Sequence, residues 1–353
     1  MLDYIIVGGG LAGLAFARQA QVNRKSFVIM EGGFPSASEV AGGIYNPVVL
    51  KRLRMVDDAP LLLDRMHRFF DQVLEDYGID FRNPLPIWRK IASIEEQNDW
   101  FAACDRMPQF LEPSIVANSI SGVDAAFGFG RVLGTGYVET SRFISHLRNS
   151  FTNDGFLLTE QFDFNQLRIA DGISYKNLFA RHIVFAEGCM IRNNPYFEYL
   201  PLVGTKGELL HLKISDLKLD VMIKGGVFVM PLANQVFKVG STYNWSDTTW
   251  QPTMSGREEI LSKFEEIIDL PYEIVGHIAG IRPTVKDRKP LIGTHPEYKN
   301  VHVLNGLGSR GVMLAPAMSE YLFDHIENET PLPSKYDIAR FTSLRRDRNG
   351  QTY

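Results

Sequence analysis

Continuous apolar runs of strand length recur along the chain. They fall at 4–7, 26–30, 182–186 and 301–304. A strand that is apolar throughout is typical of a parallel sheet covered on both faces, whereas a half-exposed strand alternates. The pattern therefore predicts a buried parallel sheet whose strands are far apart in the sequence.

Between these runs the apolar residues follow two other periods. Helical spacing predicts helices at 59–77, 140–151, 257–268 and from 311 to about 326. Residues 204–245 alternate with glycine turns, which predicts an antiparallel sheet, and residues 84–137 break into short strands and turns. Small residues and turn formers at 35–50 predict a loop. Because the antiparallel material separates the parallel strands, we expect one domain built from several segments and a second domain inserted into it.

The first apolar strand runs directly into Gly8-x-Gly10-x-x-Gly13 and then into a helix. Gly8 permits the tight turn, Gly10 lets a pyrophosphate approach the backbone, and Gly13 allows close packing of helix on strand. The helix N-terminus offers N–H groups and a positive dipole end to phosphates. Glu31 ends the second strand, about 20 residues further on, where an acidic side chain binds ribose hydroxyls. These features predict a dinucleotide site.

Composition narrows the class of protein. The 353 residues are enough for two domains, and 45% hydrophobic with 22% charged residues is ordinary for a globular protein. Because no apolar run could span a membrane and the N-terminus lacks a signal-peptide pattern, we expect a cytoplasmic protein that binds no membrane. The two cysteines, Cys104 and Cys189, have no partner motif, so neither a disulfide nor a metal site is expected.

The net charge of −4 gives no general attraction to nucleic acid, but two basic clusters leave a local contact open. One cluster is Lys51, Arg52 and Arg54, and the other is Arg340, Arg345, Arg346 and Arg348. A solvated face or a terminal tail is the alternative interpretation of each.

Several further motifs resemble the D-amino-acid oxidase superfamily of FAD-dependent oxidoreductases, of the glycine oxidase and sarcosine oxidase type. The stretch AGIRPTVKDRKPLIG (279–293) is similar to a glycine oxidase motif. GLGSRGVMLAP (306–316) is closer to the oxidase half of the bifunctional enzyme that modifies wobble uridine in tRNA. Lys-Gly-Glu at 206–208 and Val-Phe-Ala-Glu-Gly at 184–188 also match family motifs, although Glu187 replaces the usual hydroxyl residue.

The resemblance implies an α/β fold. It has a Rossmann-type, glutathione-reductase-like FAD-binding domain with an inserted α+β substrate domain built on an antiparallel sheet. We expect the FAD-binding domain at 1–78, 138–203 and 280–345, the substrate domain at 79–137 and 204–279, and a tail at 346–353.

The resemblance also implies non-covalent FAD. Covalent relatives use a cysteine near the substrate arginine, and this chain has none between Cys189 and its C-terminus. The residues expected at the cofactor are Gly8, Gly10, Leu11, Ala12, Gly13, Glu31, Gly32, Ala41, Gly42, Gly43, Ile44, Phe162, Ala186, Glu187, Gly188, Arg282, Gly306, Gly308, Ser309, Arg310, Gly311, Val312 and Met313.

Five residues are candidates for the reaction itself. By resemblance, Arg282 grips a substrate carboxylate, as a guanidinium can with two parallel hydrogen bonds. A structural ion pair of Arg282 with Asp287 or Glu208 is the alternative. Arg310 is a second cation near the flavin. The resemblance places Lys238 above the flavin, where it assists the reaction with oxygen, although a lysine on the solvent side of a half-buried strand fits the alternation equally well.

Tyr243 and Phe228 match pocket positions of glycine oxidase. Phe228 replaces a tyrosine there, which removes a hydroxyl and weakens the case for glycine itself.

The resulting prediction is an FAD-dependent enzyme that oxidises the C–N bond of an amino acid or N-substituted glycine to an imine by hydride transfer to flavin N5. Its partners would be a small amine or amino acid and either oxygen or another electron acceptor. Three alternatives stay open. One is oxidative removal of the carboxymethyl group from a modified wobble uridine, which makes tRNA a partner. The others are a dehydrogenase that uses a different acceptor and a flavin-binding protein without turnover. The oligomeric state is unknown.

Overall fold

The computed structural model describes residues 1–344, and the chain divides into two compact units. Unit 1 consists of Met1–Ala41, Thr140–Thr205 and the chain from Ile281 onward, and unit 2 consists of Gly42–Glu139 and Lys206–Gly280. The two units meet along the chain at residues 140, 205 and 281, close to the domain boundaries expected at 138, 203 and 280. The expected tail and the basic residues Arg345, Arg346 and Arg348 lie outside the described residues.

Residues 42–78 depart from the expected division, because they belong to unit 2 and not to the first domain. Within this segment β3 (Ile44–Tyr45) pairs antiparallel with β10 (Gly136–Val138). In addition, the Val138 N–H donates to the Gly43 carbonyl at 2.9 Å. The segment is assigned by pairing with a strand about 90 residues away, which its local sequence does not reveal.

The sheet of unit 1 follows the order β11-β2-β1-β14-β13-β12, with β21 pairing with β14 and β20 with β21. Its strands are β1 (Leu2–Val7), β2 (Phe27–Met30), β11 (Leu157–Leu158), β12 (Leu167–Ile169), β13 (Ile173–Tyr175), β14 (Leu178–Phe185), β20 (Leu291–Thr294) and β21 (Val301–Asn305). Neighbours β11, β2, β1, β14 and β21 run parallel. This is the buried parallel sheet that the apolar runs predicted.

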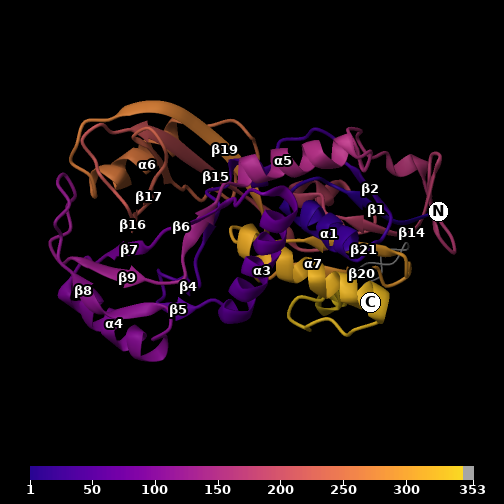
Figure 1. Cartoon of the computed structure of the whole chain (residues 1–353), viewed down its shortest axis with the longest axis horizontal. Helices are drawn as coiled ribbons and strands as arrows, with labels where there is room; N and C mark the ends of the chain where they lie inside the picture. Colours follow the sequence, from indigo (N-terminus) through magenta and orange to yellow (C-terminus); the bar gives the residue numbers. More distant parts are fainter. Residues whose placement is uncertain (345–353) are drawn as a thin grey trace. The chain divides into compact units, whose positions relative to one another are not determined.

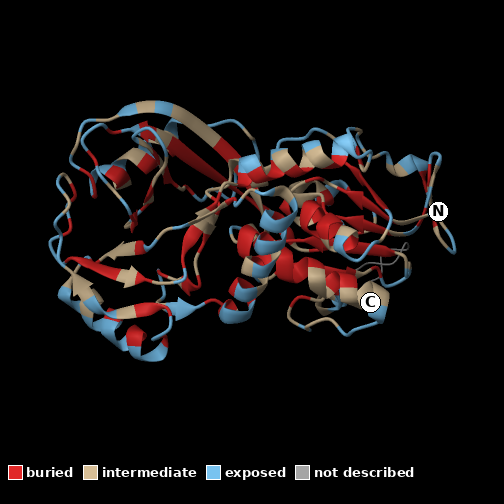
Figure 2. Cartoon of the chain, in the orientation of Figure 1, coloured by how far each residue is buried: buried red, intermediate tan, exposed pale blue. Residues whose placement is uncertain are grey.

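Helices α1 (Leu11–Val22), α2 (Ala37–Val40), α5 (Thr140–Asn153) and α7 (Gly311–Asn328) belong to unit 1, with single 3-10 turns at Phe164–Gln166, Gly188–Asn193 and Ile338–Leu344. Helices α1 and α7 lie side by side (Figure 1). Buried positions fill the central strands and the inner sides of these two helices (Figure 2). Residue 311, where the last helix was expected to begin, is the first residue of α7.

Unit 2 is built on a sheet of order β19-β15-β18-β17-β16-β7-β9-β8. Its strands are β7 (Ile87–Lys90), β8 (Leu111–Val116), β9 (Phe129–Val132), β15 (Leu202–Lys213), β16 (Met222–Lys224), β17 (Phe228–Pro231), β18 (Val236–Gly240) and β19 (Glu273–Val285). Neighbours pair antiparallel from β15 through β18 and β17 to β16, as the alternation at 204–245 predicted. Smaller pairings join β6 (Arg82–Pro84) to β10, and β4 (Val48–Val49) to β5 (Arg54–Met55).

One face of this sheet carries an apolar cluster that includes Val229 and Val239 and is covered by α6 (Met254–Glu265) through Ile260 and Phe264. Helix α3 (Ala59–Tyr77) has the bounds that its apolar stripe predicted. Helices α5 and α6 end or begin within three residues of the predicted ranges, 140–151 and 257–268.

The expectation of short strands and turns throughout 84–137 was wrong, because α4 (Ile94–Arg106) lies within it. Its N-cap is Ser93, whose hydroxyl accepts from the Glu96 N–H at 3.1 Å, while the Glu96 carboxylate accepts from the Ala92 N–H at 2.7 Å. Ser-x-x-Glu is a helix-start signal that was present in the sequence.

Candidate functional site

The turn between β1 and α1 has the geometry that its glycines require. Gly8 has a φ of +107°, and a Cβ on it would lie 2.5 Å from the Ala186 carbonyl oxygen. A Cβ on Gly13 would lie 1.8 Å from the Gly8 oxygen. At Gly10, in contrast, the nearest atom to a Cβ is the Ser38 hydroxyl at 3.4 Å. Two glycines thus serve close packing, and the third leaves its backbone approachable, which fits a pyrophosphate.

Glu31 lies directly beneath this turn. Its Oε2 accepts from the Gly9 N–H at 2.6 Å and from Arg148 Nη2 at 3.1 Å, and its Oε1 accepts from the Gly33 N–H at 3.1 Å. Arg148, on α5, also donates through Nε to the Gly9 carbonyl at 2.9 Å. Three donors therefore hold the carboxylate at the turn. The sequence pattern did not identify Arg148, because only the fold brings α5 to this turn.

Glu187 lies two residues after the neighbouring strand, β14, and Asn194 Nδ2 donates to its Oε2 at 2.7 Å. Burial raises the pKa of the Glu187 carboxyl to about 7, and the hydrogen bond from Asn194 opposes that rise. Glu187 directly follows Ala186, whose carbonyl oxygen leaves no room for a side chain on Gly8. A partly protonated carboxyl at this point leaves less negative charge beside a phosphate than an ionised one.

The second glycine-rich turn, before α7, joins the same region. Asn305 donates through Nδ2 to the Gly188 carbonyl at 3.0 Å, and its Oδ1 accepts from the Gly306 N–H at 2.7 Å. A Cβ on Gly311 would lie 3.2 Å from the Leu11 side chain, at the start of α1. The N-termini of α1 and α7 thus lie close together, next to the end of β14.

Arg282 lies next to this turn. The N–H of Gly308, which has a φ of +57°, donates to the carbonyl of the adjacent Pro283 at 3.1 Å. The Cys189 thiol donates to the Ile281 carbonyl at 3.1 Å on the other side of Arg282. Four segments that the sequence singled out therefore converge within unit 1: 8–13, 186–188, 282–285 and 305–311.

Asp287 and Glu208, the alternative ion-pair partners of Arg282, each interact with other residues. Asp287 accepts from Arg340 Nε at 2.9 Å. Glu208 accepts from the Thr253 hydroxyl at 2.7 Å and bonds His277 Nε2 at 2.8 Å.

Some residues expected at the cofactor have side chains that pack in the core or lie at the start of α7. The Phe162 ring stacks on Tyr175 with centroids 4.4 Å apart and meets Phe185 edge-on, so it belongs to the hydrophobic core. Arg310 is the N-cap residue of α7 and makes no side-chain cap hydrogen bond. Val312 and Met313 are buried in the first turn of α7.

In unit 2, Phe228 and Lys238 share one face of the sheet, opposite to α6. Phe228 pairs with Gly240 and Met230 pairs with Lys238, so all four side-chain positions point to that face. A Cβ on Gly42 would lie 3.3 Å from the tip of the Phe228 ring, which places the loop that was expected to pass the flavin on the same face. Lys238 is half-buried, and burial lowers the pKa of its amine, so it is not a freely solvated lysine.

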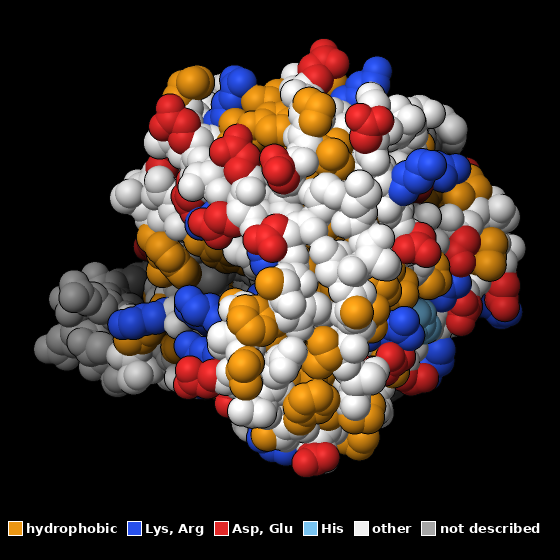
Figure 3. Space-filling model, turned by 90° about the vertical axis from the view of Figure 1, so that its left-hand side faces the viewer, with side chains coloured by type: hydrophobic (Ala, Val, Ile, Leu, Met, Phe, Trp, Pro, Cys, Tyr) orange, Lys and Arg blue, Asp and Glu red, His pale blue; other side chains and the backbone are white. Residues whose placement is uncertain are grey.

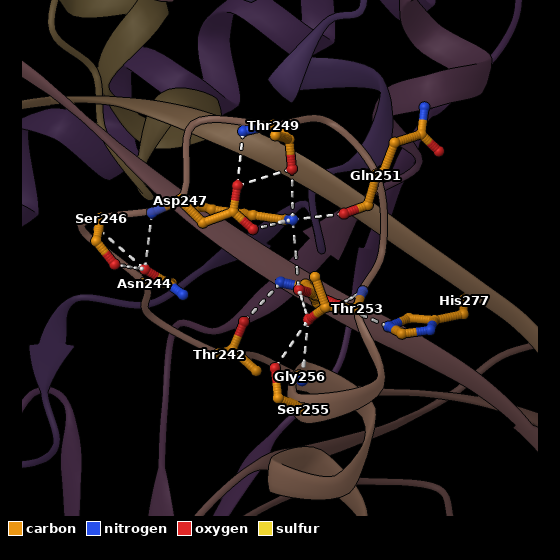
Figure 4. A network of polar contacts seen from close by, with 12 residues as sticks. Thr242, Asn244, Ser246, Asp247, Thr249, Gln251, Thr253, Ser255, Gly256 and His277 are labelled. Atoms are coloured by element: carbon orange, nitrogen blue, oxygen red, sulfur yellow. Dashed lines mark hydrogen bonds and ion pairs between the residues drawn. The ribbon is translucent and has the colours of Figure 1, made fainter.

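A buried polar network anchors the segment that follows β18 (Figure 4). Lys206, fully buried, donates to Asp247 at 2.6 Å, to Thr249 at 3.1 Å and to the Gln251 carbonyl. The hydrogen bond from Lys206 is the main cause that lowers the pKa of Asp247 to about 2. The Lys-Gly-Glu motif thus holds the segment that carries Tyr243, whose side chain is exposed.

The fold and these four converging segments define an FAD-type dinucleotide-binding oxidoreductase. A model of the family DAO, described as FAD dependent oxidoreductase, matches residues 3–325, and the chain belongs to this family. Membership confirms the expected family and FAD as the cofactor.

Among curated relatives, the chain is 24% identical to glycine oxidase of Pseudomonas aeruginosa, over 95% of this chain and 98% of that protein. It is 23% identical to the bifunctional protein MnmC of tRNA 5-methylaminomethyl-2-thiouridine biosynthesis from Marinobacter nauticus, over 91% of this chain. That match covers 55% of MnmC, so the chain spans about half the length of this relative.

Solved structures agree on the fold. Glycine oxidase from Geobacillus kaustophilus superposes with a TM-score of 0.78 at 21% identity, over 98% of this chain and 99% of that chain. L-proline dehydrogenase from P. horikoshii superposes with a TM-score of 0.79 at 16% identity, over 100% and 99%. The expected fold class is confirmed.

Two kinds of feature are absent from residues 1–344. No helix there is both long and apolar enough to cross a membrane. Nor does that part of the chain bring together three or more His, Cys, Asp or Glu side chains able to hold a metal ion.

Proposed function

We propose that this protein oxidises the C–N bond of an amino acid or N-substituted glycine, with Arg282 holding the substrate carboxylate. The observation that carries the proposal is the hydrogen bond from the Gly308 N–H to the Pro283 carbonyl, which joins the arginine strand to the turn before α7. FAD supplies the two-electron acceptor when bound. The α-carbon loses a hydride as the amine nitrogen forms the C=N bond, and water then hydrolyses the imine.

The chain's own residues bind and orient the reactants. A guanidinium at Arg282 grips a carboxylate with two hydrogen bonds and so fixes the α-carbon. The N-terminus of α7 stabilises negative charge that develops nearby. Phe228 offers no hydroxyl to a carboxylate, so the grip on the carboxylate rests on Arg282.

The thiols support non-covalent FAD. The Cys104 thiol donates to the Glu112 carbonyl and the Cys189 thiol to the Ile281 carbonyl. Burial raises the pKa of Cys104, and it raises the pKa of Cys189 to about 12, so neither forms the thiolate that attachment needs. Acid precipitation should release the yellow colour into the supernatant. Colour that stays in the pellet would contradict this part of the proposal.

The central experiment mixes the FAD-loaded protein anaerobically with glycine, sarcosine, D-amino acids and proline and follows flavin bleaching. With the best substrate, Arg282→Ala should lower the efficiency of reduction by roughly 3–5 kcal/mol, because a substrate charge is left unpaired in a desolvated site. Arg282→Lys should recover only part, since an ammonium cannot make the two-pronged contact. Admitting oxygen afterwards separates an oxidase, which is rapidly reoxidised, from a dehydrogenase.

Arg168→Ala is a matched control, because this exposed arginine donates to the nearby Asn165 carbonyl. It should reduce at the wild-type rate. If Arg282→Ala also reduced at that rate, the carboxylate-anchoring mechanism would be wrong, and amines without a carboxylate would have to be considered.

The second candidate is the removal of a carboxymethyl group from a modified wobble uridine in tRNA, the same C–N oxidation with RNA as the leaving amine. The similarity to MnmC favours it. So does the β4–β5 hairpin, where Lys51, Arg52 and Arg54 are all exposed. On the face in Figure 3, acidic and basic side chains are interspersed, so RNA binding would rest on a local cluster.

This alternative is tested in the same anaerobic assay with tRNA that carries the carboxymethylaminomethyl group. Bleaching by this tRNA, weakened by added salt and by Lys51→Glu, would support it. Bleaching by small amines alone would dismiss it.

A further inference from the structure

Two carboxyl residues follow the strands on either side of β1, and their partners differ. Strands β2 and β14 are the two neighbours of β1, and Glu31 follows the first while Glu187 follows the second. Glu31 forms an ion pair with Arg148, which compensates its charge. Glu187 accepts from the neutral amide of Asn194, and no lysine, arginine or histidine within residues 1–344 pairs with it. A negative charge on Glu187 therefore has no counter-charge in the described part of unit 1.

The Glu187 carboxyl is held in a fixed place. Asn194 is fully buried, and its Oδ1 accepts from the Tyr196 N–H at 2.9 Å while its Nδ2 donates to Glu187. On the other side of Glu187, the Asn305 amide donates to the Gly188 carbonyl at 3.0 Å. Two buried amides thus fix the carboxyl and the backbone that follows it, so Glu187 is a built part of this site.

The main chain of Glu187 lies against the dinucleotide turn. A Cβ on Gly8 would lie 3.3 Å from the Glu187 nitrogen, and the Ala186 N–H donates to the Val7 carbonyl at 2.8 Å. The carboxyl is therefore within one side-chain length of the turn that fits a pyrophosphate. The pyrophosphate of FAD carries two negative charges, and nearby negative charges disfavour the ionised form of a carboxyl.

The other charges near this strand end do not control Glu187. Burial raises the pKa of its carboxyl to about 7, the Asn194 hydrogen bond opposes the rise, and no charged group contributes. The charged or titratable side chains on the adjoining segments are Glu31, His146 and Arg148, Cys189 and Arg192 in the 3-10 turn, and Arg282 and Arg310 beside α7. Burial raises the pKa of the Cys189 thiol to about 12, so this thiol stays protonated near neutral pH.

We propose that this protein takes up a proton on Glu187 when it binds FAD, so that FAD is held more weakly as the pH rises. The exchange is balanced by one proton from solvent. The carboxylate becomes a carboxylic acid as FAD binds and loses that proton as FAD leaves, and no bond of FAD changes. The inference concerns the cofactor and is independent of which amine is oxidised.

The affinity for FAD tests this coupling without turnover. FAD is titrated into the apoprotein at pH 6, pH 7 and pH 8, and Kd is read from flavin fluorescence, since FAD keeps the same charge over this range. The wild-type Kd should rise roughly five- to tenfold from pH 6 to pH 8, because binding requires a proton. In Glu187→Gln, which is neutral at every pH, Kd should change by less than about twofold.

Calorimetry measures the proton itself. FAD is titrated into the apoprotein at pH 7.5 in two buffers that differ in their heat of ionisation. Wild type should take up about half a proton or more for each FAD bound, and Glu187→Gln should take up almost none. Should Glu187→Gln fail to fold, Glu187→Thr gives the same comparison, because a hydroxyl does not titrate in this range.

Glu198→Gln is the matched control. It removes an exposed carboxyl from the same segment, and the Glu198 N–H donates to the Asn194 carbonyl at 2.9 Å. It should keep the wild-type dependence of Kd on pH. Equal pH dependence in wild type and Glu187→Gln, or binding of FAD to wild type without proton uptake, would overturn the proposal.

A measurement on the FAD-loaded protein covers the case of an unstable apoprotein. At pH 7.5 the infrared spectrum of the loaded wild type should contain the C=O stretch of a protonated carboxyl, which Glu187→Gln lacks and Glu198→Gln retains. Identical spectra of wild type and Glu187→Gln in this region would show that Glu187 is ionised beside FAD, against the proposal.

Discussion

Arg148 Nη2 donates to Glu31 Oε2 across 3.1 Å, which ties α5 to the carboxylate beneath the dinucleotide turn. The same arginine reaches Glu39 through Nη1 at 2.6 Å. Glu31 thus connects the Gly9 N–H, Arg148 and, by the proposed binding mode, the ribose hydroxyls.

Glu31→Ala should weaken FAD binding by about 1–3 kcal/mol, because it removes charged hydrogen bonds to the ribose and loosens the turn. Equilibrium dialysis or flavin fluorescence measures the Kd. Glu39→Ala is the matched control, since it removes the other carboxylate on Arg148 but leaves the Gly9 contact. Equal affinity of Glu31→Ala and wild type would exclude a ribose role for Glu31.

Lys238→Met should slow reoxidation of the reduced flavin by oxygen far more than it slows reduction by substrate. A fixed cation stabilises the negative charge that forms on oxygen. Stopped-flow absorbance separates the two half-reactions. Lys213→Met, an exposed lysine on the facing strand β15, should change neither. If Lys238→Met slowed both half-reactions equally, Lys238 would have no specific role toward oxygen.

Glu187→Gln should stabilise the protein at alkaline pH. The folded-state pKa of Glu187, about 7, lies above the ordinary value of 4.5, so the folded state binds more protons between these values. The wild type therefore loses this contribution as pH rises from 4.5 through 7, and the glutamine variant does not. The difference in free energy of unfolding at pH 8 should be about 1–3 kcal/mol in favour of the variant. Denaturant titration at pH 5 and pH 8 checks it, and a pH-independent difference would refute the assignment.

Acid should destabilise unit 1 through a histidine pair. His182 Nδ1 lies 3.1 Å from His302 Nε2, and His302 is fully buried. Burial lowers the pKa of His182 to about 4 and that of His302 well below its usual range. Because the unfolded state binds protons first, stability is lost as pH falls from about 6.5 toward 4.

For His182 alone, the loss at pH 5 amounts to about 2 kcal/mol relative to pH 7. His182→Asn keeps a polar group near His302 but does not titrate, so its stability should change less between pH 7 and pH 5. Thermal unfolding of both proteins at the two pH values measures the difference. A variant that lost as much stability as the wild type would show that other groups cause the acid sensitivity.

The sequence by itself determined the features that depend on local geometry. Gly8, Gly10 and Gly13 define a strand–turn–helix in which a Cβ would clash with the backbone at Gly8 and at Gly13. Because all three glycines lie within six residues, the local sequence alone predicts this turn. The bounds of α3 likewise follow from a clear apolar stripe. The match of 279–293 and 306–316 to family motifs indicated the FAD-dependent class before any contact was known.

The tertiary structure alone decided what depends on distant segments. Arg148 meets Glu31 only because α5 packs beside the dinucleotide turn, and residues 42–78 join unit 2 only because β3 pairs with β10. Phe228 and Lys238 share a face of the unit 2 sheet only through the register of β17 against β18. Register, burial and charge pairing are properties of the folded chain, because each is set by residues that the local sequence does not contain.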